Sequence, residues 1–344
     1  MIDEECSCWP PFSLRRLGIY GGQPTGDRPG RPDPADFTIE NQDGTVTGRL
    51  PGKIDGQQFI IKNCKDSQIY LFDHSATITV DDCERCKFVF GPIKGSIFFR
   101  NCKDCQAVVA CQQFRTRDCK KLDIFLHCVS QPIIEASTGM KFACYQYAYP
   151  ELKDQFQKAG LSLFSNNWFN IHDFTPVAGE ANWSLLPETA TVDHYVPFPN
   201  TEEFNSVNVS SNADEFVVPV TRGSREKKYD ESCLLLFFGN AITRCMEFTN
   251  ELKKKATFDI VQTKEVKMTA EDASRILRNE NFADAVAQGP AVGVEVNGEN
   301  MIQACLDVRS DMRIEETVLH ISGNKDEAQR EIDAFYNFVD ITMS

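Results

Sequence analysis

Four cysteines in the first half of the chain have the spacing of a metal site. They occur as Cys83-x2-Cys86 and, after fifteen intervening residues, Cys102-x2-Cys105, a pattern typical of a four-thiolate zinc site. A second candidate follows closely, because the polar stretch "QQFR" ends in Arg115, whose planar guanidinium can bridge phosphate oxygens. The elements that position these side chains decide between thiolate and guanidinium chemistry.

The cysteines belong to a repeat of about nineteen residues. Cys64, Cys83, Cys102 and Cys119 stand 19, 19 and 17 residues apart. Apolar residues recur five residues before each of them and five and seven residues after, so the pattern has a period of two. A unit of this length with short alternating strands is typical of one coil of a parallel β-helix, whose coils stack about 4.8 Å apart. We therefore predict a right-handed parallel β-helix.

The repeat argues against zinc. The position three residues after each repeat cysteine is equivalent in all four coils. It is occupied by Ser67, Cys86, Cys105 and Leu122. A zinc ligand position is not expected to hold serine or leucine in the flanking coils, whereas free cysteine is among the most buried residue types. We therefore favour an inward-facing column of small, weakly polar side chains over zinc, and predict no metal site.

The same register places the "QQFR" group. Phe114 shares the inward column with the other apolar residues that precede the repeat cysteines, so Gln113 and Arg115 are expected to point outward. Equivalent positions in the coil before predict three stacked pairs: Gly95 under Gln112, Ser96 under Gln113, and Phe98 under Arg115.

Phe98 and Ile60 are then large apolar groups in the outward column of Arg115. An arginine and an amide beside an apolar patch and a basic rim are typical of a partner-binding face. The alternative is a surface arginine paired with Asp104 or Asp118.

Charge limits the class of partner. The net charge of −14 argues against a general nucleic-acid binder. Residues 84–121 contain nine basic and only three acidic residues. This excess predicts either a surface that binds a negatively charged partner or a solvated surface. The absence of a long apolar run and of a signal-peptide core favours a cytoplasmic protein with reduced thiols.

Composition divides the chain into four parts. Residues 1–36 are polar and rich in Gly and Pro and are predicted to be a disordered tail. Residues 37–186 hold the β-helix, and residues 187–229 are expected to be a linker. Residues 230–344 alternate strand and helix patterns, with a capping box at Thr269 and Asp272, and predict a ferredoxin-like α+β domain.

Several phrases closely resemble the tubulin-folding cofactor C family, in its branch associated with X-linked retinitis pigmentosa. They are "GRLPG", "GPIKGSIFFRNCKDC", "ACQQFRTRDC", "QPIIEAS" and "WSLLPE", and the resemblance covers about residues 45–344. It implies a cofactor C-like β-helix and GTPase-activating activity toward an Arf-like small GTPase, of the ADP-ribosylation-factor-like protein three type, in trafficking of lipidated cargo at the cilium. Tubulin is an alternative partner, and a non-catalytic effector of the Arf-like GTPase is an alternative role.

The resemblance also assigns roles by motif. It implies that Arg115 is an arginine finger supplied to the partner's active site, and Gln113 is predicted as a second catalytic residue. It also implies that Gly95, Ser96, Gln112 and Gln113 contact the nucleotide and that Glu135 supports the partner interface. We further predict Phe114 at the nucleotide, and Phe98 and Arg117 at that interface. GTP and Mg²⁺ are expected to be held by the partner, so no cofactor of its own is predicted.

The amino-terminal sequence departs from the family. Its members begin Met-Gly-Cys, which permits myristoylation and palmitoylation, whereas this chain has Ile2 and no glycine at the second position. Cys6 and Cys8 remain as palmitoylation candidates, although one acyl chain anchors a protein weakly. We expect a cytoplasmic protein at the periphery of the plasma membrane or at the ciliary base.

The carboxyl-terminal part resembles nucleoside diphosphate kinase in "GPAVGVEVNGENMIQA" and "VLHISGNKDEAQREIDAFY". His320 falls where that family carries its phosphorylated histidine. However, Thr317 replaces the family's asparagine, and Ile321, Ser322 and Gly323 stand where it has Gly-Ser-Asp. Residues 307–317 are too few for its nucleotide-binding loop. We predict a strand histidine without kinase activity.

Overall fold

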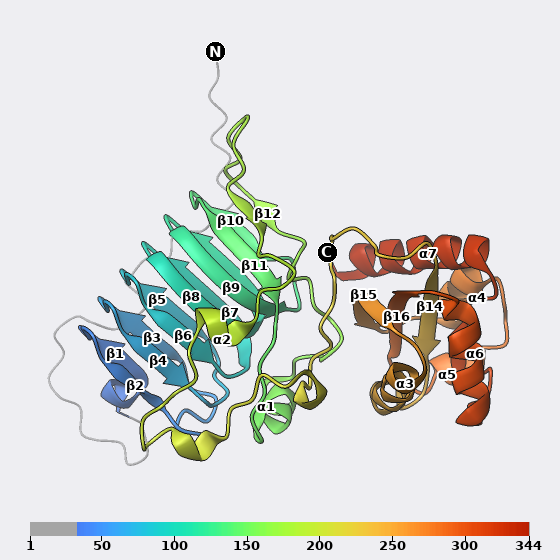
Figure 1. Cartoon of the computed structure of the whole chain (residues 1–344), viewed down its shortest axis with the longest axis horizontal. Helices are drawn as coiled ribbons and strands as arrows, with labels where there is room; N and C mark the ends of the chain where they lie inside the picture. Colours follow the sequence, from blue (N-terminus) through green and yellow to red (C-terminus); the bar gives the residue numbers. More distant parts are fainter. Residues whose placement is uncertain (1–32, 344) are drawn as a thin grey trace, which may run out of the picture. The chain divides into compact units, whose positions relative to one another are not determined.

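The computed structural model describes residues 33–343 and contains two separate sheets (Figure 1). From residue 37 onward the chain forms one compact unit. The predicted tail lies outside the described residues except for residues 33–36, as do Ile2, Cys6 and Cys8. In the part of the chain that the structure describes, no helix is long and apolar enough to cross a membrane.

The first sheet is the predicted parallel β-helix. Its 13 strands pair in parallel, and alternate strands stack on two faces (Figure 1). The first face contains β1 (Thr38–Glu40), β3 (Phe59–Lys62), β5 (Ile78–Asp81), β7 (Ile93–Arg100), β10 (Ile133–Glu135) and β12 (His172–Asp173). The second contains β2 (Val46–Arg49), β4 (Gln68–Leu71), β6 (Lys87–Phe90), β9 (Lys120–Cys128), β11 (Met140–Cys144) and β13 (Trp183–Leu185). The long strand β8 (Lys103–Arg117) contributes its first half to the second face and its last half to the first.

Asparagine and aspartate make the corners of the coils. Asn63, Asp82, Asn101 and Asp118 each precede a repeat cysteine and have φ between 51° and 55°. This left-handed conformation is accessible to Asn and Asp because their short polar side chains can hydrogen-bond locally. The repeated phrases "NCKD" and "DCER" are therefore the turns between the two faces.

The repeat cysteines fill the core, as the register predicts. Cys64, Cys83, Cys102 and Cys119 are buried, and each thiol donates to the carbonyl oxygen two residues earlier at 3.3–3.4 Å. In the neighbouring column, the Ser67 hydroxyl makes the same bond to the Lys65 carbonyl at 2.6 Å. Serine and cysteine are thus equivalent donors in the stack, and the zinc interpretation is not needed to explain the spacing.

Residues 187–229, predicted as a linker, contain α2 (Val192–Tyr195) and the 3-10 helices Asn205–Val207 and Ala213–Glu215. Phe204 and Val218 are buried in the same cluster as Tyr70 of β4, whose hydroxyl donates to the Pro197 carbonyl at 2.7 Å. This segment therefore covers the second face of the β-helix. The domain limits placed at its ends stay a prediction.

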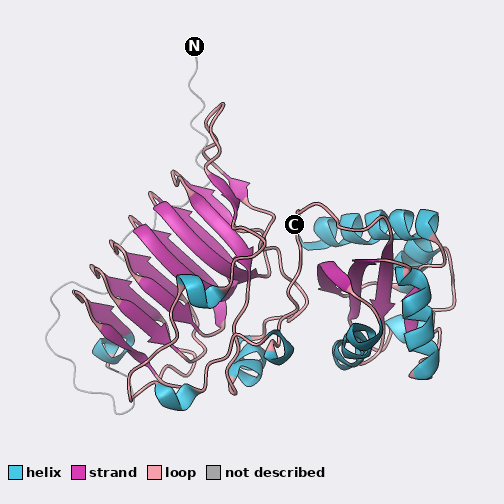
Figure 2. Cartoon of the chain, viewed as in Figure 1, coloured by secondary structure: helices cyan, strands magenta, loops and turns pink. Residues whose placement is uncertain are grey.

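The second sheet has the predicted ferredoxin-like topology (Figure 2). Its strands are β14 (Ser232–Phe237), β15 (Phe258–Val266), β16 (Ala291–Gly298) and β17 (Leu319–Ile321), paired antiparallel in the order β15-β16-β14-β17. Its helices are α3 (Ala241–Lys255), α4 (Ala270–Leu277), α5 (Ala283–Val286), α6 (Met301–Asp311) and α7 (Lys325–Met343); an earlier helix, α1 (Leu152–Ala159), contacts the β-helix instead. The capping box is confirmed, because Asp272 N donates to the Thr269 hydroxyl at 3.1 Å and Thr269 N to the Asp272 carboxylate at 3.0 Å.

Candidate functional site

One outward column of the first face runs past Arg115. The register of β7, β8, β10 and β12 sets Phe98 beside Arg115, Arg115 beside Ile133, and Ile133 beside His172. Phe114, which directly precedes Arg115 in β8, is completely buried between Phe99 and Phe142. The alternation that turns Phe114 inward and Arg115 outward is confirmed. Arg115 therefore lies on a regular strand with an apolar neighbour on each side.

The pairing predicted between the coils is one-to-one at two of three positions. Ser96 lies beside Gln113 and Phe98 beside Arg115. At the third position, Gln112 is opposed by both Lys94 and Gly95, because the ladder shifts between Ile93 and Ser96 and two residues of β7 oppose one of β8. Such a bulge locally bends the strand and redirects side chains.

Gly95 allows a close approach of two coils at this bulge. Its amide donates to the Ala76 carbonyl at 2.8 Å, and a Cβ at position 95 would lie 2.9 Å from that oxygen. Gly95 and Ser96 are both partly exposed, as is Gln112, while Gln113 is exposed. These four residues thus form a small polar edge next to Arg115, and their contact with nucleotide stays a prediction.

The next outward column carries charge. Arg100, Arg117 and Glu135 are neighbours in the register. The Arg100 guanidinium lies 5.5 Å from the centre of the Phe98 ring and donates to Asp81 through Nε at 2.7 Å. These contacts hold Phe98 in the outward column. Arg117 and Glu135 are exposed beside it, in positions where a partner could reach them.

Asp104 and Asp118, the acids considered as structural partners for Arg115, form ion pairs with other residues. Asp118 lies 3.6 Å from Arg117 Nε, and Asp104 lies 3.8 Å from Lys103 and 3.9 Å from Lys121.

Two exposed apolar side chains that follow β12 were missed in the sequence. Phe174 is 53% exposed and Val177 is 52% exposed. The Phe174 ring packs edge-on against the His172 ring, with 4.5 Å between the ring centres. The backbone amide of Phe174 donates to the Ile134 carbonyl at 2.9 Å. In the register Phe174 follows Asp173 and so continues the Arg117–Glu135 column, next to the column of Arg115. The nineteen-residue repeat offered no register this far along the chain, and a lone phenylalanine in a polar loop was the only signal.

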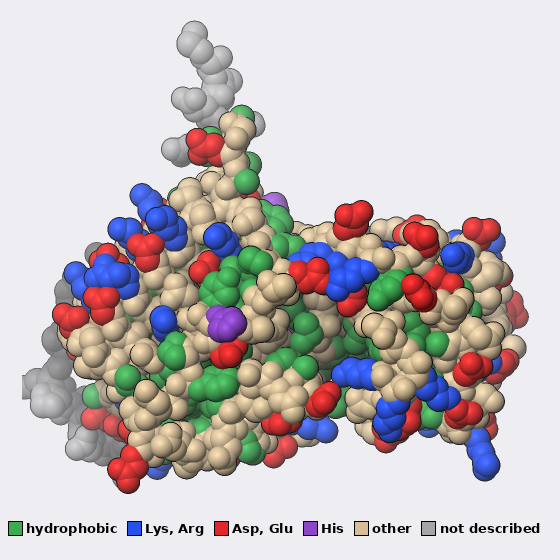
Figure 3. Space-filling view, in the orientation of Figure 1, with side chains coloured by type: hydrophobic (Ala, Val, Ile, Leu, Met, Phe, Trp, Pro, Cys, Tyr) green, Lys and Arg blue, Asp and Glu red, His purple; other side chains and the backbone are tan. Residues whose placement is uncertain are grey.

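Stacking neutralises part of the basic run between residues 84 and 121. Arg85 pairs with Asp66 at 2.7 Å and Arg100 with Asp81, both acids of the preceding coil. Basic and acidic side chains accordingly alternate along one edge of the β-helix (Figure 3). The solvated face, rather than a surface of net positive charge, is the better interpretation of this run.

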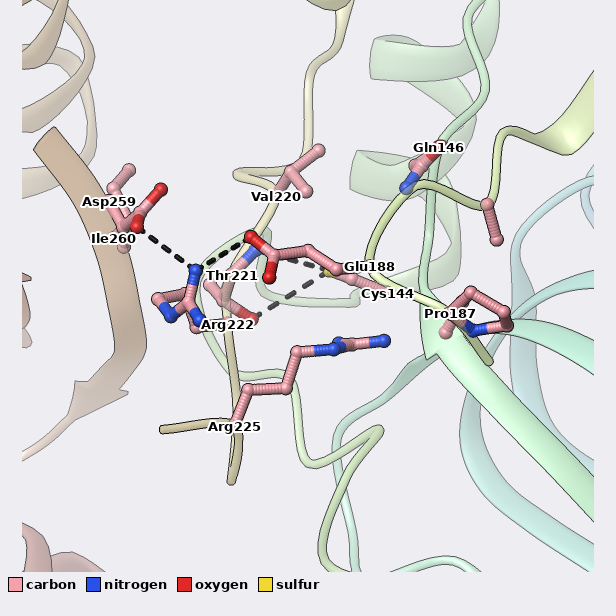
Figure 4. A pocket seen from close by; sticks show the side chains of 12 residues that line it. Cys144, Gln146, Pro187, Glu188, Val220, Thr221, Arg222, Arg225, Asp259 and Ile260 are labelled. Atoms are coloured by element: carbon pink, nitrogen blue, oxygen red, sulfur yellow. Dashed lines mark hydrogen bonds and ion pairs between the residues drawn. The ribbon is translucent and has the colours of Figure 1, made fainter. Parts of the chain in front are cut away.

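The candidate site is an open face and not a pocket. A hollow of about 180 Å³ is lined by residues of β11, β15 and the segments around Glu188 and Arg222, and includes none of the predicted site residues (Figure 4). Among the described residues, no group of three or more His, Cys, Asp or Glu side chains is arranged to hold a metal ion.

His320 lies in β17, as predicted, and contacts a buried carboxylate. Its Nε2 is 2.8 Å from Glu331 of α7, which also accepts from the Ser322 hydroxyl at 2.8 Å. Burial alone would raise the pKa of Glu331, but these hydrogen bonds and the charge of His320 hold it below its usual value. Only seven residues, 312–318, separate α6 from β17.

Comparison with known proteins is consistent with this architecture. The family model described as "Tubulin binding cofactor C" matches residues 56–174, the coils that carry Gly95, Phe98 and Arg115. The fold and this match define a β-helix protein of cofactor C type. Over its whole length, the chain is 48% identical to Protein XRP2 of Gallus gallus across 353 residues, which cover 96% of this chain and 98% of that protein. The chain belongs to the XRP2 family.

Other relatives share less of the chain. Protein XRP2 of Danio rerio is 50% identical over 92% of this chain and 85% of its own. Tubulin-specific chaperone C of Homo sapiens is 32% identical over 44% of each chain. Among solved structures, tubulin binding cofactor C from Leishmania major matches with a TM-score of 0.30 and 28% identity over 34% of this chain and 81% of that chain. A nucleoside diphosphate kinase family protein from Babesia bovis matches with a TM-score of 0.26 and 14% identity. The match covers 30% of this chain and 87% of that chain.

Proposed function

We propose that this protein is a GTPase activator that supplies Arg115 in trans to an Arf-like small GTPase of the ADP-ribosylation-factor-like protein three type. The observation that carries the proposal is the column Phe98–Arg115–Ile133. It presents one guanidinium between apolar neighbours on a regular strand, within the segment matched by the cofactor C family model.

A guanidinium held in this way suits the transition state of GTP hydrolysis. Charge develops on the phosphoryl oxygens as the reaction proceeds, and a planar arginine can donate two hydrogen bonds to them. An arginine finger accelerates GTP hydrolysis by roughly 10³ to 10⁵, which corresponds to about 4 to 7 kcal/mol of barrier. A rigid strand is well suited to this task because the side chain needs little reorganisation when the complex forms.

The neighbouring residues would complete the contact. The polar edge of Gly95, Ser96, Gln112 and Gln113 would lie against the nucleotide, while Phe98 and Phe174 would bury apolar area against the GTPase. GTP and Mg²⁺ would be held by the partner. Release of lipidated cargo at the cilium is the cellular setting in which we propose that this activity is used.

Single-turnover GTP hydrolysis by the Arf-like protein tests the proposal. Stimulation is expected with the wild-type chain and to fall by about 10³ or more with Arg115→Ala. Arg115→Lys should retain little of the stimulation of GTP hydrolysis, because an ammonium cannot bridge two oxygens as a guanidinium does. Arg85→Ala, which removes an exposed arginine paired with Asp66 on an earlier coil, is the matched control and should behave as wild type.

Each alternative has its own outcome in the same assay. Equal stimulation by wild type and Arg115→Ala would refute the finger. Tight binding of the GTP form without acceleration would identify an effector. Acceleration of GTP hydrolysis by tubulin, but not by the Arf-like protein, would favour the activity implied by tubulin-specific chaperone C, with which this chain shares 32% identity.

A further inference from the structure

The ferredoxin-like sheet is joined to the β-helix along its edge strand β15. Residues 162–167, which follow α1, cover this edge. The Thr263 hydroxyl donates to the Phe164 carbonyl at 2.7 Å, and Glu265 N donates to the Ser165 hydroxyl at 3.2 Å. Ser165 in turn donates to the Glu265 carbonyl at 3.3 Å. An edge strand that would otherwise expose its backbone groups is thus paired to the β-helix.

Lys264, between these two residues of β15, is almost completely buried. Only 3% of its surface is exposed, and its ammonium donates to the Asn167 side-chain oxygen. Placing a lysine charge in a buried position is unfavourable unless hydrogen bonds compensate for the lost water. Most other arginine and lysine side chains of residues 33–339 remain at least partly exposed. The role of Lys264 is therefore its contact with Asn167 and not the solubility of the protein surface.

Asn167 extends that contact into the coil next to Arg115. Its backbone amide donates to the Cys128 carbonyl at 2.7 Å and its side-chain amide to the Val129 carbonyl at 2.6 Å. The following backbone then binds β8, because Val129 N donates to the Cys111 carbonyl at 3.1 Å and Ser130 N to the Gln112 carbonyl at 3.0 Å. A chain of hydrogen bonds thus links Lys264 to β8, the strand that contains Gln113 and Arg115.

A second set of contacts holds the same segment. The Arg222 guanidinium bridges Glu188 at 2.8 Å and Asp259 of β15 at 3.0 Å (Figure 4). Arg225 lies 5.2 Å from the ring of Trp168, whose indole nitrogen donates to the Thr221 hydroxyl at 2.9 Å. Trp168 directly follows Asn167, so residues 166–168 are fixed from both sides.

We propose that Lys264 is a positioning residue for GTPase activation: through Asn167 it sets the backbone of residues 128–130 against β8 and thereby the placement of Gln112, Gln113 and Arg115. This inference rests on the proposed function. The carboxyl-terminal sheet then acts as a support for the activating face. A displacement of about 1 Å at a catalytic group can cost up to about 10² in rate, so a buried support several residues away affects turnover.

Saturation curves of GTP hydrolysis against full-length protein provide the test. Lys264→Met is expected to lower the stimulated rate at saturation about tenfold. The half-saturating concentration should change by less than about twofold, because Phe98 and Phe174 keep their own ladder contacts. Lys264→Arg, which retains a long cationic donor, should stay within about threefold of wild type. Lys267→Met, an exposed lysine just after β15, is the matched control.

A second variant separates positioning from loss of folding. Asn167→Ala removes the other half of the link, and the double variant Lys264→Met/Asn167→Ala should lose no more activity than either single one. Rates are normalised to the folded fraction measured by thermal unfolding; if Lys264→Met does not fold, Asn167→Ala carries the same expectation. Wild-type rates for folded Lys264→Met or Asn167→Ala, or additive losses, would overturn the inference.

Arg115→Ala in the same assay keeps the two proposals distinguishable. Its full activity would refute the proposed function itself. An inactive Arg115→Ala beside a fully active Lys264→Met would overturn only the role of Lys264.

Discussion

Phe174 provides the sharpest test of the docking face, because it is exposed in the free protein and lies beside the column that contains Arg115. A phenylalanine side chain has about 200 Å² of surface, and 53% of it is exposed here, so about 100 Å² is available to a partner. At about 25 cal/mol per Å², full burial would contribute up to about 2.5 kcal/mol. That free energy corresponds to a factor of up to about 60 in affinity.

We therefore expect Phe174→Ala to raise the half-saturating concentration for GTPase stimulation by about 10- to 60-fold. The rate at saturation should change little, because the guanidinium of Arg115 is untouched. Stability should stay within about 0.5 kcal/mol of wild type, since the side chain is exposed.

The measurement is stimulated GTP hydrolysis as a function of protein concentration, together with direct binding to the GTP-bound partner. Val220→Ala, which truncates an apolar side chain that is 40% exposed in the segment that precedes the carboxyl-terminal sheet, serves as the control. An unchanged half-saturating concentration in Phe174→Ala would refute the docking role. A lower saturating rate at unchanged affinity would instead place Phe174 in the hydrolysis step.

Two further predictions concern the core. An excess of zinc chelator should leave the midpoint of thermal unfolding unchanged, because the Cys83, Cys86, Cys102 and Cys105 thiols donate to backbone carbonyls; a large fall would restore the zinc interpretation. Burial lowers the pKa of His127 to about 3, so the unfolded chain binds a proton at this residue below about pH 6.5 while the folded chain does not. Stability should therefore fall by about 3 kcal/mol between pH 7 and pH 4 from this group alone, and urea unfolding of His127→Phe should lack that part of the decline; an identical pH dependence would contradict it.

Local rules explain why the β-helix could be predicted. The period of two, the spacing of the repeat cysteines and the Asn and Asp corners all act within one coil of about nineteen residues. Once coils stack in register, Phe114 must face inward and Arg115 outward, as observed. The bulge at Gly95 could not be found this way, because the extra residue changes the pairing of two strands without changing the apolar period.

The sequence by itself determined the repeat, the outward direction of Arg115 and the order of strands and helices that makes the second sheet ferredoxin-like. Each of these follows from periodicity and turn residues within short segments.

Only the tertiary structure decided what surrounds the candidate site. Stacking paired part of a basic run with acids from the preceding coil, such as Asp66 and Asp81. It brought Phe174 to the preceding coil, where its amide donates to the Ile134 carbonyl, and buried Lys264 against Asn167, 97 residues away in the chain. These contacts join segments that no local pattern relates, because they depend on which surfaces meet when the coils and the second sheet pack.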